Sequence, residues 1–361
     1  MEELVGIYDG VHQTPDYQDS GIMFLSVENI ATLKSEKYIS EEAFERDYKV
    51  YPEKGDILMT RIGDVGTTNV VETAEKVAFY VSLALLKPNE IDSYFLSNAM
   101  KTNAFQKGLR ERTLVTAIPQ KINKDEIGKI DIFITNNDEE QKKIGAYFSN
   151  LDHLITFHQR KCEQTKKLKK YMLQKMFPKE GQTVPEVRFE GFTDAWEKRK
   201  FGDLGSVSMC RRIFKEQTAT EGDIPFYKIG TFGGEPDAFI SRALFEEYKE
   251  KYQYPEVGDM LISASGTIGR TVEYAGEDAY FQDSNIVWFK HDDRVDNSFL
   301  KCIYSSVKWS GIEGSTIKRL YNDNFLKTEF SMPNAEEQKK IGEYFQNLDH
   351  LITLHQRKYK N

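Results

Sequence analysis

The sequence has little of what marks a secreted, membrane-bound or metal-binding protein. Only three of its 361 residues are cysteines, Cys162, Cys210 and Cys302. An odd and scattered set of this kind argues against a disulfide framework or a zinc site. No apolar run approaches the length of a membrane span, and the N-terminus MEELVGIYDG has no signal-peptide character. We therefore expect a cytoplasmic protein with no membrane partner and no metal of its own.

Motifs of catalysis and cofactor binding are also absent. The sequence contains neither the GxxxxGK[ST] phosphate loop nor the GxGxxG dinucleotide fingerprint, and it has no HExxH and no GxSxG. Its segments TRIGDVGTT and SASGTIGR contain only GxxG turns, which commonly connect strands. The sequence predicts a chain that is not an enzyme, with no catalytic residue and no cofactor of its own.

One weak pattern suggests an alternative. Asp237 follows a proline and precedes Glu247 and Lys249, which is similar to the metal-binding arrangement of some nucleases. Short patterns of this kind arise easily in a chain with 29% charged residues, and RALFEEYKEKY equally predicts a solvated amphipathic helix. A metal-dependent DNA nuclease therefore remains an alternative hypothesis.

The net charge of −8 does not by itself favour nucleic-acid binding. Whole-chain charge does not show how the charged residues are distributed, however. A protein that docks several partners can be acidic overall and still carry a basic cleft. The charge therefore leaves the question open.

A nearly identical segment occurs twice in the sequence. Residues 139–161 read EEQKKIGAYFSNLDHLITFHQRK, and residues 336–358 read EEQKKIGEYFQNLDHLITLHQRK, so only three of 23 positions differ. Asn137 and Asn334 each stand three residues before a glutamate, which is typical of a helix N-cap. The chain is therefore predicted to contain two copies of one unit, each a variable body followed by a near-invariant helix.

Both repeated helices are predicted to carry one narrow apolar seam. The apolar residues recur at heptad-like steps of four, three and four. We expect the two helices to pair through this seam in an antiparallel coiled coil, because a two-fold relation between identical faces runs them in opposite directions. In the alternative, each helix packs on its own body. The predicted seam residues are Ile144, Phe148, Leu151, Ile155, Ile341, Phe345, Leu348 and Ile352.

The two bodies are distant copies of one fold. Tyr51-Pro52 with Gly55-Asp56 matches Tyr254-Pro255 with Gly258-Asp259 at a constant offset, and the GxxG turns match as well. Short β-rich runs such as ILMT and NIVWF alternate with glycine-rich turns. The sequence therefore predicts an α+β protein with two globular domains, duplicated internally and separated by two long helices.

Both bodies place polar and basic residues in turns beside predicted strands. Arginine, glutamine and asparagine read base edges in the major groove, and lysine and arginine also neutralise phosphates. A solvated surface would explain any one of these residues, whereas the set in both bodies favours DNA. The candidate DNA-binding residues are His12, Gln13, Thr14, Arg61, Lys107, Arg110, Arg112, Arg211, Arg212, Thr231, Arg270, Lys318 and Arg319.

These segments together resemble the DNA-specificity subunit of type I restriction-modification enzymes. The resemblance covers nearly the whole chain and rests on the doubled EEQKKIG…LDHLI…HQRK, on LKKYMLQKMFP, on VRFEGFTDAWEKRKFGDL and on IPFYKIGTFG…LISASGTIGR. It implies two target-recognition domains, each reading one half of a split, asymmetric DNA site. Half-sites on one face of the duplex would lie about 34–36 Å apart.

The resemblance also implies domain boundaries and partners. It gives a first target-recognition domain at 1–138, a spacer helix at 139–178, a linker strap at 179–200, a second target-recognition domain at 201–335 and a short second spacer helix at 336–361. The partners would be double-stranded DNA, two adenine methyltransferase subunits that use S-adenosylmethionine, and restriction motor-nuclease subunits that use ATP and Mg²⁺. Compared with the family pattern, both ends are expected to be shortened.

Three functions thus stand beside one another. A non-catalytic DNA reader should lose affinity steeply as salt rises. A nuclease built on Asp237, Glu247 and Lys249 should cleave DNA with Mg²⁺ as the isolated chain. A coiled-coil scaffold with protein-binding heads should show no salt-dependent affinity for DNA.

Overall fold

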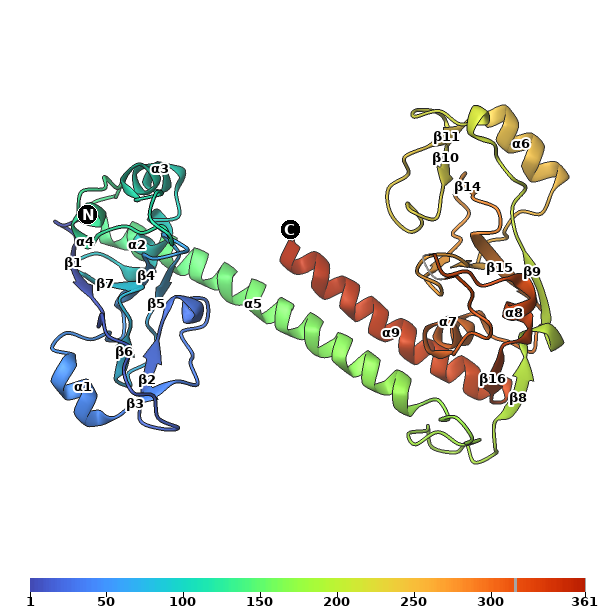
Figure 1. Ribbon diagram of the computed structural model, residues 1–361, viewed down its shortest axis with the longest axis horizontal. Helices are drawn as coiled ribbons and strands as arrows, with labels where there is room; N and C mark the ends of the chain where they lie inside the picture. The colour runs from blue at the N-terminus through green and yellow to red at the C-terminus, as the bar shows by residue number, and fades with distance from the viewer. Residues whose placement is uncertain (315–316, 361) are drawn as a thin grey trace. The chain divides into compact units, whose positions relative to one another are not determined.

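The computed structural model describes residues 1–314 and 317–360, which form two compact units, Met1–Thr156 and Phe157–Asn361. Both units combine β-sheets with helices, and the long helices α5 (Asp138–Lys175) and α9 (Ala335–Lys360) follow their sheets (Figure 1). The predicted α+β class is confirmed. Within the described residues, no helix combines the length and the apolar character that crossing a bilayer requires.

The first unit is built on two small sheets. Strands β1 (Val5–Asp9), β7 (Leu83–Pro88), β4 (Ile57–Thr60) and β5 (Thr68–Val70) form an antiparallel sheet in that order, and β3 (Tyr38–Ile39), β2 (Ile22–Leu25) and β6 (Val77–Phe79) form a second. The 3-10 helix η1 and four short helices complete the unit: η1 (Val27–Asn29), α1 (Glu41–Asp47), α2 (Ser93–Ala99), α3 (Asn103–Arg112) and α4 (Lys124–Gly128).

Strand β4 shows how this sheet divides the core of the first unit. Ile57 and Met59 lie in one cluster of buried residues, whereas Leu58 lies in another. Alternate residues of a strand point to opposite faces, so the run ILMT supplies both clusters at once. This explains why all four of its residues are buried.

The second unit repeats this topology. Strands β13 (Thr271–Glu273), β12 (Met260–Ser263), β15 (Ile286–His291) and β9 (Gly205–Ser208) form the larger sheet, and β11 (Phe239–Ile240), β10 (Ile224–Tyr227) and β14 (Tyr280–Phe281) form the smaller. The strand orders match those of the first unit. Its other helices are η2 (Phe201–Asp203), η3 (Lys215–Gln217), α6 (Arg242–Lys251), α7 (Asn297–Ser306) and α8 (Asn322–Lys327).

One strand pair distinguishes the two units. In the second unit, β8 (Glu197–Lys200) pairs with β16 (Glu329–Met332), and Phe330 of β16 packs against Phe201 with ring centroids 4.6 Å apart. In the first unit, which the structure describes throughout, the corresponding residues 131–135 form no strand. Phe133, the counterpart of Phe330, is 83% exposed there, against 6% for Phe330.

Each repeated helix packs on its body through the same device. Gln141 of α5 accepts a hydrogen bond from the backbone N–H of Asp92 at 3.1 Å, and Gln338 of α9 accepts one from Asp296 at 3.0 Å. One turn further along, a Cβ on Gly145 would lie 2.4 Å from the Asp92 carboxylate. A Cβ on Gly342 would likewise collide with the body. Glycine is therefore required at both positions.

The second half of α5 runs antiparallel to α9 within the second unit. Nδ1 of His158 lies 3.0 Å from Nδ1 of His355, Lys169 pairs with Asp349 at 2.5 Å, and Phe177 lies near Phe345. Residue numbers rise along α5 as they fall along α9, which establishes the direction. Long helices that pack against each other are thus present, as predicted.

The predicted seam is largely buried in the second copy of the repeat, where only Ile352 is half-buried, and largely exposed in the first. Ile341, Phe345 and Leu348 are at most 6% exposed, because α9 packs against both α7 and Met172 and Leu173 of α5. Of their counterparts, Ile144 packs on the first body. The rest of the seam is exposed: Phe148 44%, Leu151 37% and Ile155 38%. The two repeats therefore contact each other at their ends, at His158 and His355, whereas Phe345 and Leu348 of α9 pack against α5 residues that follow the repeat.

Candidate nucleic-acid interface

The candidate residues of the second unit lie on loops that are hydrogen-bonded to one another. The backbone N–H of Ala264, after β12, donates to the carbonyl of Asn285 at 2.8 Å, and Leu320 donates to Ala264 at 2.8 Å. The backbone N–H of Gly266 in the GxxG turn donates to Lys318 at 2.9 Å. Three segments far apart in the sequence are thus joined through their backbones.

Arg270 ends the GxxG turn and connects it to a further loop. Its guanidinium Nη1 donates to the carbonyl of Phe232 at 2.8 Å, while its backbone N–H donates to Ser263 Oγ at 2.9 Å. Its side chain nevertheless remains exposed. One guanidinium edge is therefore held in place while the group faces solvent, which is a suitable arrangement for a base or phosphate contact.

Thr231 lies in the loop that Arg270 contacts. Its hydroxyl bonds to the backbone of Lys228, at 3.2 Å from the N–H and 3.3 Å from the carbonyl. The hydroxyl therefore closes a local turn, and its role in this structure is to shape the loop. The same loop is joined to the loop after β14, because the backbone N–H of Ile229 donates to Gln282 Oε1 at 2.9 Å.

Lys318 and Arg319 are exposed beside the GxxG turn. Arg319 forms backbone bonds with Glu313 in both directions, at 3.0 and 2.8 Å, so these two residues are paired as an antiparallel bridge. Arg212 joins the same surface through its bond to Asp283 at 2.8 Å. Arg211 lies over the ring of Tyr252, 5.3 Å from its centroid.

The first unit has the same backbone frame. Arg61 N donates to Ser82 at 2.9 Å, Ile122 N donates to Arg61 at 2.9 Å and Gly63 N donates to Gln120 at 2.9 Å. These bonds correspond one by one to those of Ala264, Leu320 and Gly266. The two units therefore hold equivalent loops in equivalent positions and differ in the side chains that the loops display.

Arg61 does not lie on the exposed surface of this frame. It is 6% exposed, forms an ion pair with Asp9, and leaves its Nε without a hydrogen-bond partner. Burial lowers the pKa of its guanidinium because a low-dielectric environment disfavours the charged form. Its counterpart in the second unit is Ala264, so Arg61 and Arg270 are not equivalent residues. In this structure Arg61 is part of the protein interior.

The other candidates of the first unit are exposed, except for the half-buried Arg112. His12, Gln13 and Thr14 lie on the loop after β1, where Tyr80 donates to the His12 carbonyl at 3.4 Å. Lys107 and Arg110 lie on the outer face of α3, opposite the buried Phe105 and Leu109, and Arg112 is half-buried at its end. The structure thus places a loop group and a helix group on the first unit.

The sequence reasoning missed the hairpin loop of residues 114–121. Lys121 corresponds to Arg319, and the loop displays Val115 at 68% exposure and Ile118 at 100% exposure. The loop of the second unit displays Ile317 at 63% exposure. Apolar side chains can contact the thymine methyl group, so these tips belong to the candidate interface. Only the spacing from the GxxG turn could have identified the loop from the sequence.

The nuclease-like residues do not form one site. Asp237 pairs with Lys228 at 2.8 Å and Glu247 with Lys251 at 3.0 Å, while Lys249 lies over the rings of Phe245 and Tyr254. Within residues 1–314 and 317–360, no three carboxylate, histidine or cysteine side chains are grouped to hold a metal ion. The geometry therefore gives the nuclease alternative no support.

The comparison with known families assigns the protein to a class. The model described as the type I restriction modification DNA specificity domain matches residues 14–167 and 193–361. Because the match covers most of the chain, the chain belongs to this family. This is the family that the sequence analysis named as a resemblance.

Particular relatives agree with this class. The chain is 57% identical over 158 residues to S.HindORF215P of Haemophilus influenzae, named as a type I restriction enzyme specificity subunit, which covers 43% of the chain and 41% of that protein. It is 24% identical over 333 residues to a protein of Methanocaldococcus jannaschii named as the MjaX specificity subunit, covering 83% of the chain and 73% of that protein. The first match thus spans about two-fifths of the relative's length.

A solved structure matches the fold of the whole chain. The S subunit of a type I restriction-modification system from M. genitalium aligns with a TM-score of 0.66 at 14% identity, over 99% of this chain and 90% of that chain. At this identity the match concerns the fold alone. It confirms that two sheet-containing domains and two long helices form one known architecture.

Proposed function

We propose that each unit reads one half of a split DNA site through the loops around its GxxG turn. The observation that carries this proposal is the shared frame: Gly63 N–Gln120 O and Gly266 N–Lys318 O are both 2.9 Å, while the displayed side chains differ. An equivalent frame with unlike side chains suits two unlike half-sites. The assigned readers are Arg270, Lys318, Arg319, Arg211 and Arg212 in one unit, and His12, Gln13, Thr14, Lys107, Arg110, Arg112 and the loop 114–121 in the other.

The catalytic work belongs, in this proposal, to other subunits. Two adenine methyltransferase subunits would supply S-adenosylmethionine chemistry, and motor-nuclease subunits would use ATP and Mg²⁺, with the assembly in the cytoplasm. The domain limits 1–138, 139–178, 179–200, 201–335 and 336–361 are part of the same proposal. The family membership of the chain supports it, as does the 57% identity to a protein named as a specificity subunit.

The decisive experiment maps N6-methyladenine in a host that expresses this chain together with its methyltransferase. We expect one split motif with two unlike halves. Exchanging residues 114–121 for residues of a differing relative should change one half of the motif only. Methylation without a split motif would contradict the proposal.

A binding measurement separates the reader from a protein-binding scaffold. DNA affinity of a reader should fall steeply between 50 and 200 mM salt, because phosphate contacts release counterions. A scaffold should show no such dependence. The purified chain should also leave DNA intact in Mg²⁺, whereas cleavage abolished by Glu247→Ala would restore the nuclease alternative.

A further inference from the structure

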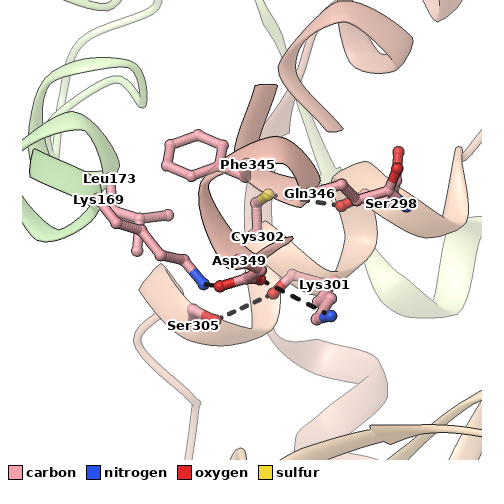
Figure 2. Close-up of a pocket in the computed structure, with 9 residues that line it drawn as sticks. All are labelled: Lys169, Leu173, Ser298, Lys301, Cys302, Ser305, Phe345, Gln346 and Asp349. Atoms are coloured by element: carbon pink, nitrogen blue, oxygen red, sulfur yellow. Dashed lines mark hydrogen bonds and ion pairs between the residues drawn. The ribbon is translucent and has the colours of Figure 1, made fainter. Parts of the chain in front are cut away.

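Residues 157–200 of this chain cover a surface in the second unit whose counterpart in the first unit is open. The segment consists of the second half of α5 and the residues that follow it up to the end of strand β8, which include the linker strap, and it contacts α9 and β16. Figure 2 shows its helical part, where Lys169 and Leu173 lie against Phe345 and Asp349 of α9. The chain contains one copy of this segment, although it contains two copies of the surface.

The apolar contacts of the strap show what the first unit leaves open. Phe189 packs edge-to-face on Tyr344 of α9 with ring centroids 6.0 Å apart, and Leu173 packs beside Phe345. The counterparts Tyr147 and Phe148 on α5 are 62% and 44% exposed. Identical side chains are thus buried in one unit and face solvent in the other.

The ionic contacts repeat this difference. In the second unit, Arg188 of the strap holds Glu337 with two hydrogen bonds of 2.7 and 2.8 Å, and Glu337 is fully buried. Its counterpart Glu140 is exposed and bonds only to the hydroxyl of Thr135, at 2.5 Å. Asp349 meets Lys169, whereas its counterpart Asp152 is 60% exposed beside Lys101.

The backbone supplies a third, independent difference. Strand β16 is paired along residues 329–332 by β8, and Lys198 reaches Glu329 at 2.9 Å. Residues 131–135, the counterpart of this strand, have no ladder partner and expose Phe133. An extended segment without a neighbour binds an added strand through its main chain.

We propose that the first half of α5 and residues 131–135 form a single docking surface for a second polypeptide. The occupant is a helix–strap–strand segment with the pattern of residues 157–200: an apolar seam like Leu173 and Phe177, an arginine like Arg188, and a basic strand like residues 197–200. A second copy of this chain does not fit, because its own segment is already buried in its own second unit. The inference concerns assembly and does not depend on DNA reading.

The charges of the two surfaces are complementary. The open surface carries the acidic Glu140 and Asp152, whereas the segment carries a lysine or arginine at each matching contact, Lys169 and Arg188. A buried bidentate arginine–carboxylate pair fixes both position and orientation. The pairing therefore specifies one register for the incoming segment.

The test uses a fluorescein-labelled peptide of residues 157–200 and the full chain, with binding followed by fluorescence anisotropy. We expect one peptide per chain, at least tenfold weaker binding to Phe148→Asp, and weaker binding to Glu140→Arg. A peptide with Arg188→Glu should bind the Glu140→Arg chain better than the unmodified peptide does. This reciprocal exchange identifies the contact directly.

Leu154→Asp is the matched control. Its counterpart Leu351 is 41% exposed even where the segment is bound, so a charge at 154 should leave peptide binding unchanged. Absence of binding would overturn the proposal. Binding that survives both Phe148→Asp and Glu140→Arg would overturn it too, because the peptide would then be exchanging with the chain's own segment in the second unit.

Discussion

The start of α5 and the start of α9 have nearly the same sequence and very different surroundings. Phe345 of α9 is 2% exposed, while Phe148 at the same place in α5 is 44% exposed. Both helices make the same glutamine–glycine contact with their bodies, but α9 also packs closely on α7, and residues 157–200 cover α9 alone. An apolar seam thus indicates that a helix has a partner, but it does not identify the partner.

The largest expected effect is the difference in stability loss between alanine substitutions of these two phenylalanines. Phe345→Ala should lower the free energy of unfolding of the second unit by about 3–5 kcal/mol, because it leaves a cavity in a packed core. Phe148→Ala should change the stability of the first unit by no more than about 0.5 kcal/mol. Urea unfolding followed by circular dichroism measures both variants.

Tryptophan fluorescence assigns the effect to a unit, because Trp196, Trp288 and Trp309 all lie in the second unit. The midpoint seen by fluorescence should fall for Phe345→Ala and stay fixed for Phe148→Ala. Equal losses for the two variants would show that the start of α5 is covered in solution.

The next largest effect is the difference in stability loss between alanine substitutions of Glu337 and of its counterpart Glu140. Glu337→Ala leaves Arg188 without its carboxylate, and its guanidinium Nη1 already has no hydrogen-bond partner. Removing one member of a buried ion pair costs about 3 kcal/mol or more. Glu140→Ala, at the exposed counterpart, should cost less than about 1 kcal/mol. The same unfolding experiment compares them, and a similar loss for both would contradict the difference in burial.

A smaller effect distinguishes the two arginines beside the GxxG turns. Arg270→Ala should weaken binding by about 1–3 kcal/mol and relax one half of the DNA motif, if its exposed guanidinium reads a base. Arg61→Ala should instead destabilise the first unit, because it leaves the partly buried Asp9 without its partner. Binding to a panel of DNA sites measures the first change. A uniform loss for Arg270→Ala across all sequences would make that residue a phosphate contact.

The smallest expected effect depends on pH and concerns the His158–His355 contact between the helices. The pKa of His158 is lowered, first by desolvation and then by the positive charges of Lys358 and His355. Lys161 and Cys162 lie about one turn further along α5. The unfolded chain, with a histidine pKa of about 6.5, therefore binds the proton more readily than the folded chain. This contribution to stability is complete above about pH 6.5 and is lost as the pH falls below it.

Thermal unfolding at pH 7.5 and 5.5 tests this sign. His158→Gln should reduce the drop in Tm on acidification relative to the unmodified chain. A steeper drop for His158→Gln would mean that the protonated ring stabilises the contact.

Local signals in the sequence were sufficient to predict where the long helices begin and that the fold is duplicated. Asn137 caps α5 by accepting from the backbone N–H groups of Glu139 and Glu140 at 3.0 and 3.1 Å, and Asn334 caps α9 by accepting from Glu337 at 3.0 Å. Capping is a contact between residues two or three apart, so its sequence pattern is reliable. The matched GxxG turns likewise revealed the duplication.

Non-local contacts set the limit of prediction at the candidate interface. Arg61 was predicted at a DNA-binding surface because it adjoins a turn, but its burial depends on Asp9, 52 residues earlier. Lys121 was missed because its pairing with the GxxG turn crosses about sixty residues of chain. The residues that pack on the helical seam could not be predicted either, since two nearly identical repeats are equally compatible with several pairings.

The glutamine–glycine docking of each helix has a consequence for how such a chain can change. Gln141 and Gly145 contact the capped start of α2, and Gln338 and Gly342 contact that of α7 through Asp296 and Ser298. None of these atoms belongs to the loops around the GxxG turns. Recombination that exchanges a whole body, with its capping aspartate, would therefore keep the joint intact while replacing the displayed loops. Such a joint would allow the loops to change without any compensating change in the helices.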